Sequence, residues 1–171
     1  MNYSKALNEC IESAYMVAGH FGARYLESWH LLIAMSNHSY SVAGATLNDY
    51  PYEMDRLEEV ALELTETDYS QDEIFTELPF SHRLQVLFDE AEYVASVVHA
   101  KVLGTEHVLY AILHDGNALA TRILERAGFS YEDKKDQVKI AALRRNLEER
   151  AGWTREDLKA LRQRHRTVAD K

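Results

Sequence analysis

The sequence predicts an all-α protein built from two copies of one four-helix repeat, followed by a basic helical tail. Three observations support this prediction: apolar residues recur at helical spacing, the chain matches itself after a shift of 77 residues, and its 171 residues include only two prolines and seven glycines. Apolar residues at steps of three and four form one face of a helix, whereas a half-buried strand alternates. With 46% apolar residues, the chain is long enough to bury a core.

The internal repeat runs without gaps from Ser4 to Asn48 of the first copy. The shift by 77 residues places Ser4 on Ser81 and His30 on His107. A fixed internal period indicates a repeated structural unit rather than unrelated helices. Further superposed pairs are Leu7 with Leu84, Ala18 with Ala95, Leu26 with Leu103, Ala43 with Ala120 and Leu47 with Leu124.

Each copy is expected to open with a long amphipathic helix. Ser4 and Ser81 precede these helices and are expected to be N-caps, since a serine hydroxyl accepts an unpaired backbone N–H. The second helix of each copy is short and nearly apolar throughout, so we expect it to be buried. In the first copy, the helices after the opening one are predicted at 28–36, at 42–48 and after Pro51. In the second copy, they are predicted at 105–113, at 117–127 and, beyond the stop at Gly128, after Ser130.

Domain boundaries follow from the loss of periodicity. Residues 65–79 are rich in acids and lack a sustained apolar pattern, which predicts a surface linker. The first repeat is therefore predicted at 1–64, the second at 80–149, and a basic tail at 150–171. Within the tail, the segment from Trp153 to Leu158 has the residues of a capped helix start.

Charge is divided unevenly along a chain whose net charge is −9. Residues 1–133 contain 22 acids and 7 bases, whereas residues 134–171 contain 12 bases and 6 acids. An acidic body disfavours nucleic acid, so no nucleic-acid partner is expected. The sequence also has no long apolar run and no export leader, so we expect no membrane partner and a cytoplasmic location.

No catalytic residue and no metal ligand is predicted. The histidines His30, His107, His38 and His114 lack the spacing of metal-binding motifs, so we interpret them as core or cap residues. The single cysteine, Cys10, lies within a helical pattern and is interpreted as a small core residue. No nucleophile motif such as Gly-x-Ser-x-Gly is present. We therefore expect a binding domain rather than an enzyme.

The segment Leu103-Gly104-Thr105-Glu106-His107-Val108-Leu109, with the later stretch from Ala118 to Gly128, resembles the second repeat of the Clp N-terminal domain. The stretch from Arg24 to Leu32 is similar to the same element in the first repeat. The resemblance covers about residues 1–145 and is to the ClpC type of Clp ATPase. Residues beyond Arg150 resemble the start of the linker to the first ATPase module.

This resemblance implies two pseudo-twofold-related four-helix repeats that recruit substrates and MecA-type adaptors to an ATP-driven unfoldase. The unfoldase delivers proteins to the ClpP peptidase, and ClpC-type domains also bind phosphoarginine marks on substrates. ATP belongs to the parent protein, because this chain contains no Gly-x-x-x-x-Gly-Lys-Ser/Thr loop, and we expect no cofactor in it. Two alternatives stay open: a fragment of the unfoldase, or a free-standing Clp-repeat protein that regulates a protease assembly.

The candidate ligand site is the helix start at Thr105 and Glu106. Unpaired N–H groups at a helix start attract a phosphoryl group, and a carboxylate can bind the adjoining guanidinium. The alternative is that Thr105 only caps the helix and Glu106 only complements its dipole. In the first copy Trp29 takes the position of Glu106 and Glu27 that of the glycine, so Glu27 could supply the carboxylate there. Trp29 is either an exposed anchor for a partner or a core residue.

Overall fold

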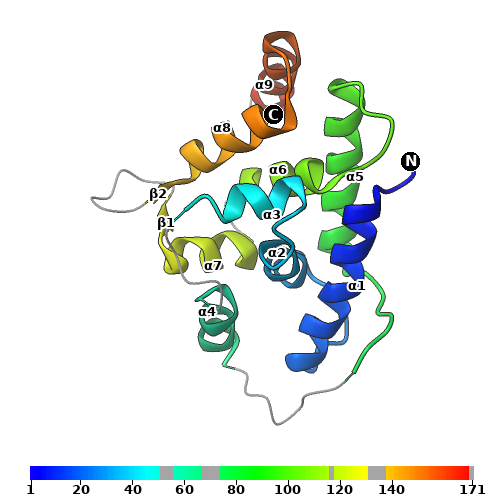
Figure 1. Ribbon diagram of the computed structural model, residues 1–171, viewed down its shortest axis with the longest axis vertical. Helices are drawn as coiled ribbons and strands as arrows, with labels where there is room; N and C mark the ends of the chain where they lie inside the picture. The colour runs from blue at the N-terminus through cyan, green and yellow to red at the C-terminus, as the bar shows by residue number, and fades with distance from the viewer. Residues whose placement is uncertain (51–55, 67–73, 116–117, 131–137, 170–171) are drawn as a thin grey trace.

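The computed structural model describes residues 1–50, 56–66, 74–115, 118–130 and 138–169 (Figure 1). Nearly all of the ordered structure in these ranges is helical, which confirms the predicted all-α fold. In chain order the elements are α1 (Lys5–His20), α2 (Ser28–Ser36), α3 (Val42–Leu47), α4 (Arg56–Thr65), α5 (His82–Val97), α6 (Thr105–His114), α7 (Leu119–Ala127), β1 (Phe129–Ser130), β2 (Val138–Lys139), α8 (Ile140–Ala151) and α9 (Arg155–Ala169).

The helix starts reproduce the internal repeat of the sequence. Helices α5, α6 and α7 each begin 77 residues after α1, α2 and α3. Both predicted serine caps are confirmed: the hydroxyl of Ser4 accepts the N–H of Leu7, and that of Ser81 accepts the N–H of Leu84, each at 3.1 Å. The two copies are therefore built from the same local signals.

The two repeats are interlocked by a pair of equivalent backbone bridges. The N–H of Ser4 donates to the carbonyl of Leu103 (2.8 Å), next to the start of α6. At the equivalent place, the N–H of Ser81 donates to the carbonyl of Leu26 (3.0 Å), next to the start of α2. Each repeat thus holds the chain before a helix of the other repeat through a backbone hydrogen bond. This reciprocal arrangement is the pseudo-twofold relation expected from the resemblance.

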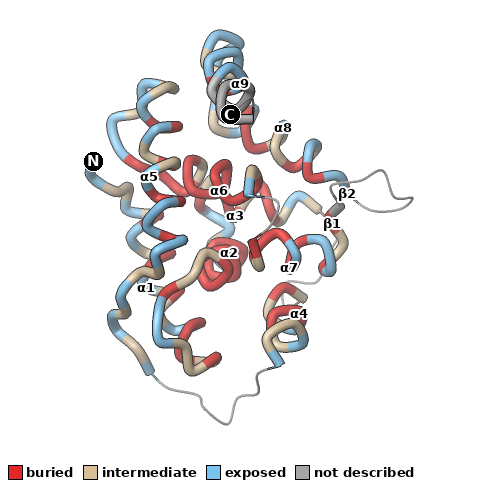
Figure 2. The backbone as a smooth tube through the Cα atoms, turned by 180° about the vertical axis from the view of Figure 1, so that it is seen from behind, coloured by how far each residue is buried: buried red, intermediate tan, exposed pale blue. Residues whose placement is uncertain are grey.

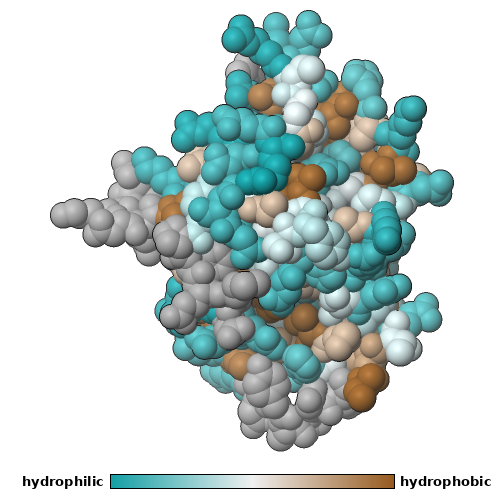
Figure 3. Space-filling view, in the orientation of Figure 1, coloured by the Kyte–Doolittle hydropathy of each residue, from teal (hydrophilic) through white to brown (hydrophobic). Residues whose placement is uncertain are grey.

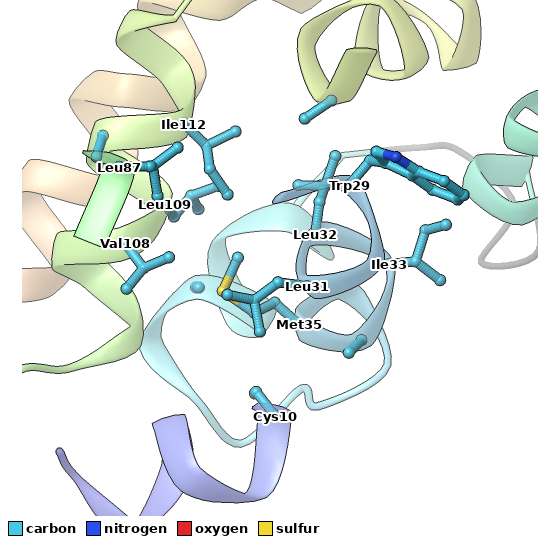
Figure 4. Packing of buried hydrophobic residues seen from close by; sticks show 14 of the residues in the cluster. Cys10, Trp29, Leu31, Leu32, Ile33, Met35, Leu87, Val108, Leu109 and Ile112 are labelled. Atoms are coloured by element: carbon cyan, nitrogen blue, oxygen red, sulfur yellow. The ribbon is translucent and has the colours of Figure 1, made fainter. Parts of the chain in front are cut away.

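Helices α2 and α6 form the centre of the core. Figure 2 shows buried residues along both helices, and every residue of α2 from Trp29 to Ser36 is buried. Figure 4 shows that these side chains leave α2 in different directions, with Trp29 and Ile33 on one side and Leu31 and Met35 on another. Around this centre, α3 packs on α8 and α7 packs on α4, so the outer helices are also exchanged between repeats.

The fourth helix of the second repeat begins later than the sequence predicts. We expected it directly after Ser130, but α8 begins at Ile140. Phe129 and Ser130 instead pair in parallel with Val138 and Lys139. The expected stop before this pair is confirmed, because Gly128 has a φ of 123°, which glycine adopts readily. Pro51 and residues 67–73 of the predicted linker lie outside the described residues, and the predicted domain boundaries stay predictions.

The basic tail is a helix, as predicted, and it packs against the body. Its start is capped reciprocally: the N–H of Asp157 donates to the Oγ1 of Thr154 (3.1 Å), and the N–H of Thr154 donates to the Asp157 carboxylate (3.0 Å). Leu161 is 1% exposed, and α9 contacts α5. The tail therefore contributes to the surface of the second repeat.

Candidate functional site

The start of α6 is held by a buried histidine. The N–H of Gly104, the N-cap residue, donates to the Nδ1 of His107 (2.8 Å), and burial lowers the pKa of His107 to about 4. The first repeat repeats this arrangement, with the N–H of Glu27 donating to the Nδ1 of His30 (2.9 Å). Burial lowers the pKa of His30 to about 3. Both imidazoles are therefore neutral acceptors that fix the two helix starts.

Thr105 joins the two repeats rather than capping its own helix. The side chain is 2% exposed, and its Oγ1 accepts the N–H of Ala43 at the start of α3 (3.2 Å). Gly104, not Thr105, takes the N-cap position of α6. The alternative in which Thr105 caps the helix is therefore wrong, and this hydroxyl positions α6 against α3.

Glu106 places a carboxylate over the backbone of the same helix start. Its side chain is 20% exposed, and burial raises the pKa of its carboxyl group. A Cβ atom at position 104 would lie 1.7 Å from the Oε1 of Glu106, so the missing side chain of Gly104 leaves room for the carboxylate. The same oxygen lies 3.5 Å from the Nδ1 of His107. Because that nitrogen is an unprotonated acceptor, the contact is not an ion pair.

A hollow of about 330 Å³ opens beside Glu106. Besides Glu106 and His107, its charged and aromatic lining consists of Lys101, Trp153 and Asp157. The Trp153 ring stacks on the His107 ring with centroids 6.0 Å apart and planes 11° apart. The hollow therefore combines two carboxylates, one ammonium group and an aromatic face at the start of a helix.

Sequence reasoning did not predict the roles of Lys101, Trp153 and Asp157 in this hollow. The internal repeat aligns Lys101 with Arg24, but this alignment does not indicate that Lys101 belongs to a site. Trp153 lies in the turn between α8 and α9, and Asp157 lies in the first turn of α9, more than forty residues after Glu106. Their approach to α6 depends on the docking of the tail, which is a tertiary contact.

The first-repeat helix start has no comparable carboxylate at the position of Glu106. Trp29 is 8% exposed, with its ring edge-on to Phe21 (centroids 4.6 Å apart) and 3.9 Å from the His30 ring. Of the two interpretations of Trp29, the structure supports the core residue. Glu27 is half-buried at the N-cap of α2. A ligand contact by Trp29 or Glu27 stays a prediction.

Comparison with protein families shows to which family this chain with its repeated fold is related. A family model of the Clp repeat (R) N-terminal domain matches residues 2–127. The chain belongs to this family. A search of curated proteins finds no match. The Clp N-terminal domain is a non-catalytic domain of Clp/Hsp100 ATPases, and such domains bind substrates and adaptors in general.

Solved structures with this fold cover nearly the whole chain. The N-terminal domain of the chaperone ClpD from Arabidopsis thaliana is 18% identical with a TM-score of 0.67, over 88% of this chain and 95% of that one. The Hsp104 N-terminal domain from Candida albicans is 16% identical with a TM-score of 0.65, over 92% and 96%. A structure from preliminary investigations of a malarial protein secretion system is 18% identical with a TM-score of 0.62, over 87% and 97%. At these identities the likeness shows the fold.

Two further observations concern the described residues of this Clp N-terminal domain. None of the described helices is both long and apolar enough to cross a membrane. Within the same ranges, no group of three or more histidine, cysteine, aspartate or glutamate side chains could hold a metal ion. His30 and His107 instead use their Nδ1 atoms to accept backbone N–H groups.

Proposed function

We propose that this chain is the substrate- and adaptor-binding N-terminal domain of an ATP-dependent Clp unfoldase of the ClpC type. In this role it receives clients and MecA-type adaptors in the cytoplasm, and the parent ATPase passes the clients to ClpP. Family membership supports the general part of this proposal. The sequence resemblance of the segment from Leu103 to Leu109 supports the ClpC type.

The hollow beside Glu106 is the proposed binding site for phosphoarginine on a client. One observation carries this proposal: the Glu106 carboxylate lies at the start of α6, beside a hollow large enough for a side chain. A phosphoarginine needs a carboxylate for its guanidinium and a positive site for its phosphoryl group. Glu106 and Asp157 supply the first, and Lys101 with the N–H groups of the helix start supplies the second.

Trp153 adds an aromatic face to the same site. A guanidinium stacks favourably on an indole, because the ring face carries partial negative charge. Trp153 already stacks on the His107 ring, so its position is fixed before a ligand arrives. Pre-positioned groups reduce the ordering cost of binding. We therefore assign guanidinium recognition jointly to Glu106 and Trp153.

The test is calorimetric titration with a short phosphoarginine peptide, using the unmodified arginine peptide as the reference ligand. Glu106→Gln removes the charge while keeping the shape of the side chain. A lost hydrogen bond between charged groups lowers affinity about tenfold to about a hundredfold. Glu27→Gln is the matched comparison, because it removes the candidate carboxylate at the equivalent helix start of the first repeat.

We expect Glu106→Gln to weaken phosphoarginine binding, and a loss in Glu27→Gln as well would show that the first repeat also binds the mark. Equal losses in both variants would refute a site confined to the second repeat. If the wild-type protein binds the marked and unmarked peptides equally, mark recognition is refuted. Binding of a MecA-type adaptor, measured by the same method, then tests the adaptor part of the proposal separately.

A further inference from the structure

A second hollow lies where helices α6, α8 and α9 meet, and it shares no lining residue with the hollow beside Glu106. Its volume is about 380 Å³. Figure 1 shows α8 and α9 meeting above α6, and Figure 3 shows that the surface at this end is mostly hydrophilic. The charged and polar lining consists of Arg144, Arg145, Arg162, Glu148, His114 and Tyr110.

His114 contributes no charge to this hollow but positions one of the arginines. Its Nδ1 lies 2.9 Å from the carbonyl oxygen of Tyr110, and a carbonyl only accepts, so Nδ1 carries the proton. Its Nε2 must then accept, and it lies 3.0 Å from the Nη1 of Arg144. Since a guanidinium always donates, both contacts fit one neutral tautomer. Arg144 is thereby held at the wall of the hollow.

Glu148 is the single acidic residue of the lining, against three arginines. Its side chain is 8% exposed, and burial raises the pKa of its carboxyl group while the three guanidinium groups lower it. Among the residues that the structure describes, no ion pair joins these arginines to a carboxylate. Positive charge therefore exceeds negative charge in the hollow.

This excess follows the basic composition of residues 134–171, which contain 12 bases and 6 acids in a chain whose net charge is −9. Arg144 and Arg145 come from α8, whereas Arg162 comes from α9. Guanidinium groups that approach from two helices can surround one anionic group and donate several charge-assisted hydrogen bonds to it. A nucleic acid would instead need an extended basic track, whereas this hollow gathers three arginines around one place.

We propose that this arginine hollow, defined by Arg144, Arg145 and Arg162, is a binding site for a single anionic group carried by a protein partner. The recognised chemistry is a phosphate or carboxylate on a peptide. This inference goes beyond the proposed function, because it concerns a different hollow, whose ligand is an anionic group without the guanidinium that phosphoarginine carries. It also gives the tail a role, since a ligand bound by Arg145 and Arg162 bridges α8 and α9.

Calorimetric titration tests the site with three peptides that differ at one central residue: phosphoserine, glutamate and serine. Arg145→Gln and Arg162→Gln each remove one positive charge from the hollow. Lys159→Gln is the matched control, because it removes the same charge from an exposed position of α9 outside the hollow. Circular dichroism of each variant confirms that the helical fold is kept.

We expect the phosphoserine or glutamate peptide to bind and the serine peptide to bind at least about tenfold more weakly, the scale of one charged hydrogen bond. Arg145→Gln and Arg162→Gln should each weaken anionic-peptide binding about tenfold, with Lys159→Gln unchanged. Binding of the phosphoserine peptide alone identifies a phosphate site, and equal binding of both anions identifies a general anion site. Failure of both anionic peptides, or an equal loss in Lys159→Gln, overturns the proposal.

This outcome is separable from that of the proposed function. Glu106→Gln lies outside the arginine hollow and should leave anionic-peptide binding unchanged. A changed affinity for the anionic peptides in Glu106→Gln, in either direction, would show that they occupy the hollow beside Glu106, and it would overturn the arginine hollow as a site.

Discussion

Acidification is expected to weaken the fold between about pH 7 and about pH 5, because His30 and His107 are buried as neutral imidazoles. Their side chains are 0% and 3% exposed, and burial lowers their pKa values from 6.5 to about 3 and about 4. The unfolded chain therefore binds more protons than the folded chain in this range. Stability is full above the unfolded pKa and falls as the pH drops towards the folded pKa.

The magnitude follows from the unfolded pKa alone, provided that the folded pKa lies well below about pH 5. Each histidine then removes roughly 2 kcal/mol between about pH 7 and about pH 5. Burial raises the carboxyl pKa values of Glu106 and Glu148, which acts in the opposite direction and offsets part of the loss. The contribution of one histidine is therefore best isolated by a variant that lacks it.

Urea unfolding of the wild-type protein and of His107→Asn at both pH values measures this contribution. The variant should be less stable at neutral pH, but its pH dependence should be flatter than that of the wild type by roughly 2 kcal/mol. His82→Asn is the control, because it replaces an exposed histidine of α5 and should keep the wild-type dependence. A pH dependence of His107→Asn equal to that of the wild type would refute the assignment of His107 as a buried neutral acceptor.

Two other substitutions test the packing. A Cβ atom in Gly44→Ala would lie 1.9 Å from the backbone carbonyl oxygen of His38. We therefore expect the free energy of unfolding, measured in urea, to fall by roughly 1–3 kcal/mol. An unchanged urea midpoint would contradict this close approach. Leu161→Asp places a charge at a position that is 1% exposed, so α9 should separate from the body and be cut faster in limited proteolysis, whereas Lys159→Asp on the exposed side should be cut at the wild-type rate.

The helix order was predictable because local signals are duplicated in the sequence. The serines at positions 4 and 81, the apolar spacing that follows them and the glycine at 128 each act within one or two turns. The later start of α8 was not predictable in the same way. It depends on a parallel pairing of Phe129–Ser130 with Val138–Lys139, a contact between segments that have too few residues to show a strand pattern.

The candidate site was only half predictable. Glu106 stands in a segment that resembles the family, and its chemistry follows from a carboxylate at a helix start. The contribution of the tail was hidden, because α9 is mostly polar and, among its residues whose burial is described, only Leu161 is fully buried, with Leu158 partly buried against the core. Two leucines on a mostly polar helix form too narrow an apolar face for periodicity to detect. Trp153 reaches the hollow from the turn that leads into α9, where it packs on His107 and Tyr110.

The two helix starts show how a repeated scaffold carries different surfaces. In both, a histidine three residues after the N-cap accepts the N-cap N–H, and this bond fixes the backbone without using the intervening side chains. The preceding position is therefore free to differ: Trp29 fills the core beside Phe21, whereas Glu106 faces a hollow completed by the tail. The described contacts of α9 are with α5 of the second repeat, so a carboxylate in place of Trp29 would lack the indole and the second carboxylate that line the hollow beside Glu106. We therefore expect the proposed specificity of this domain to depend on the tail as well as on the repeat.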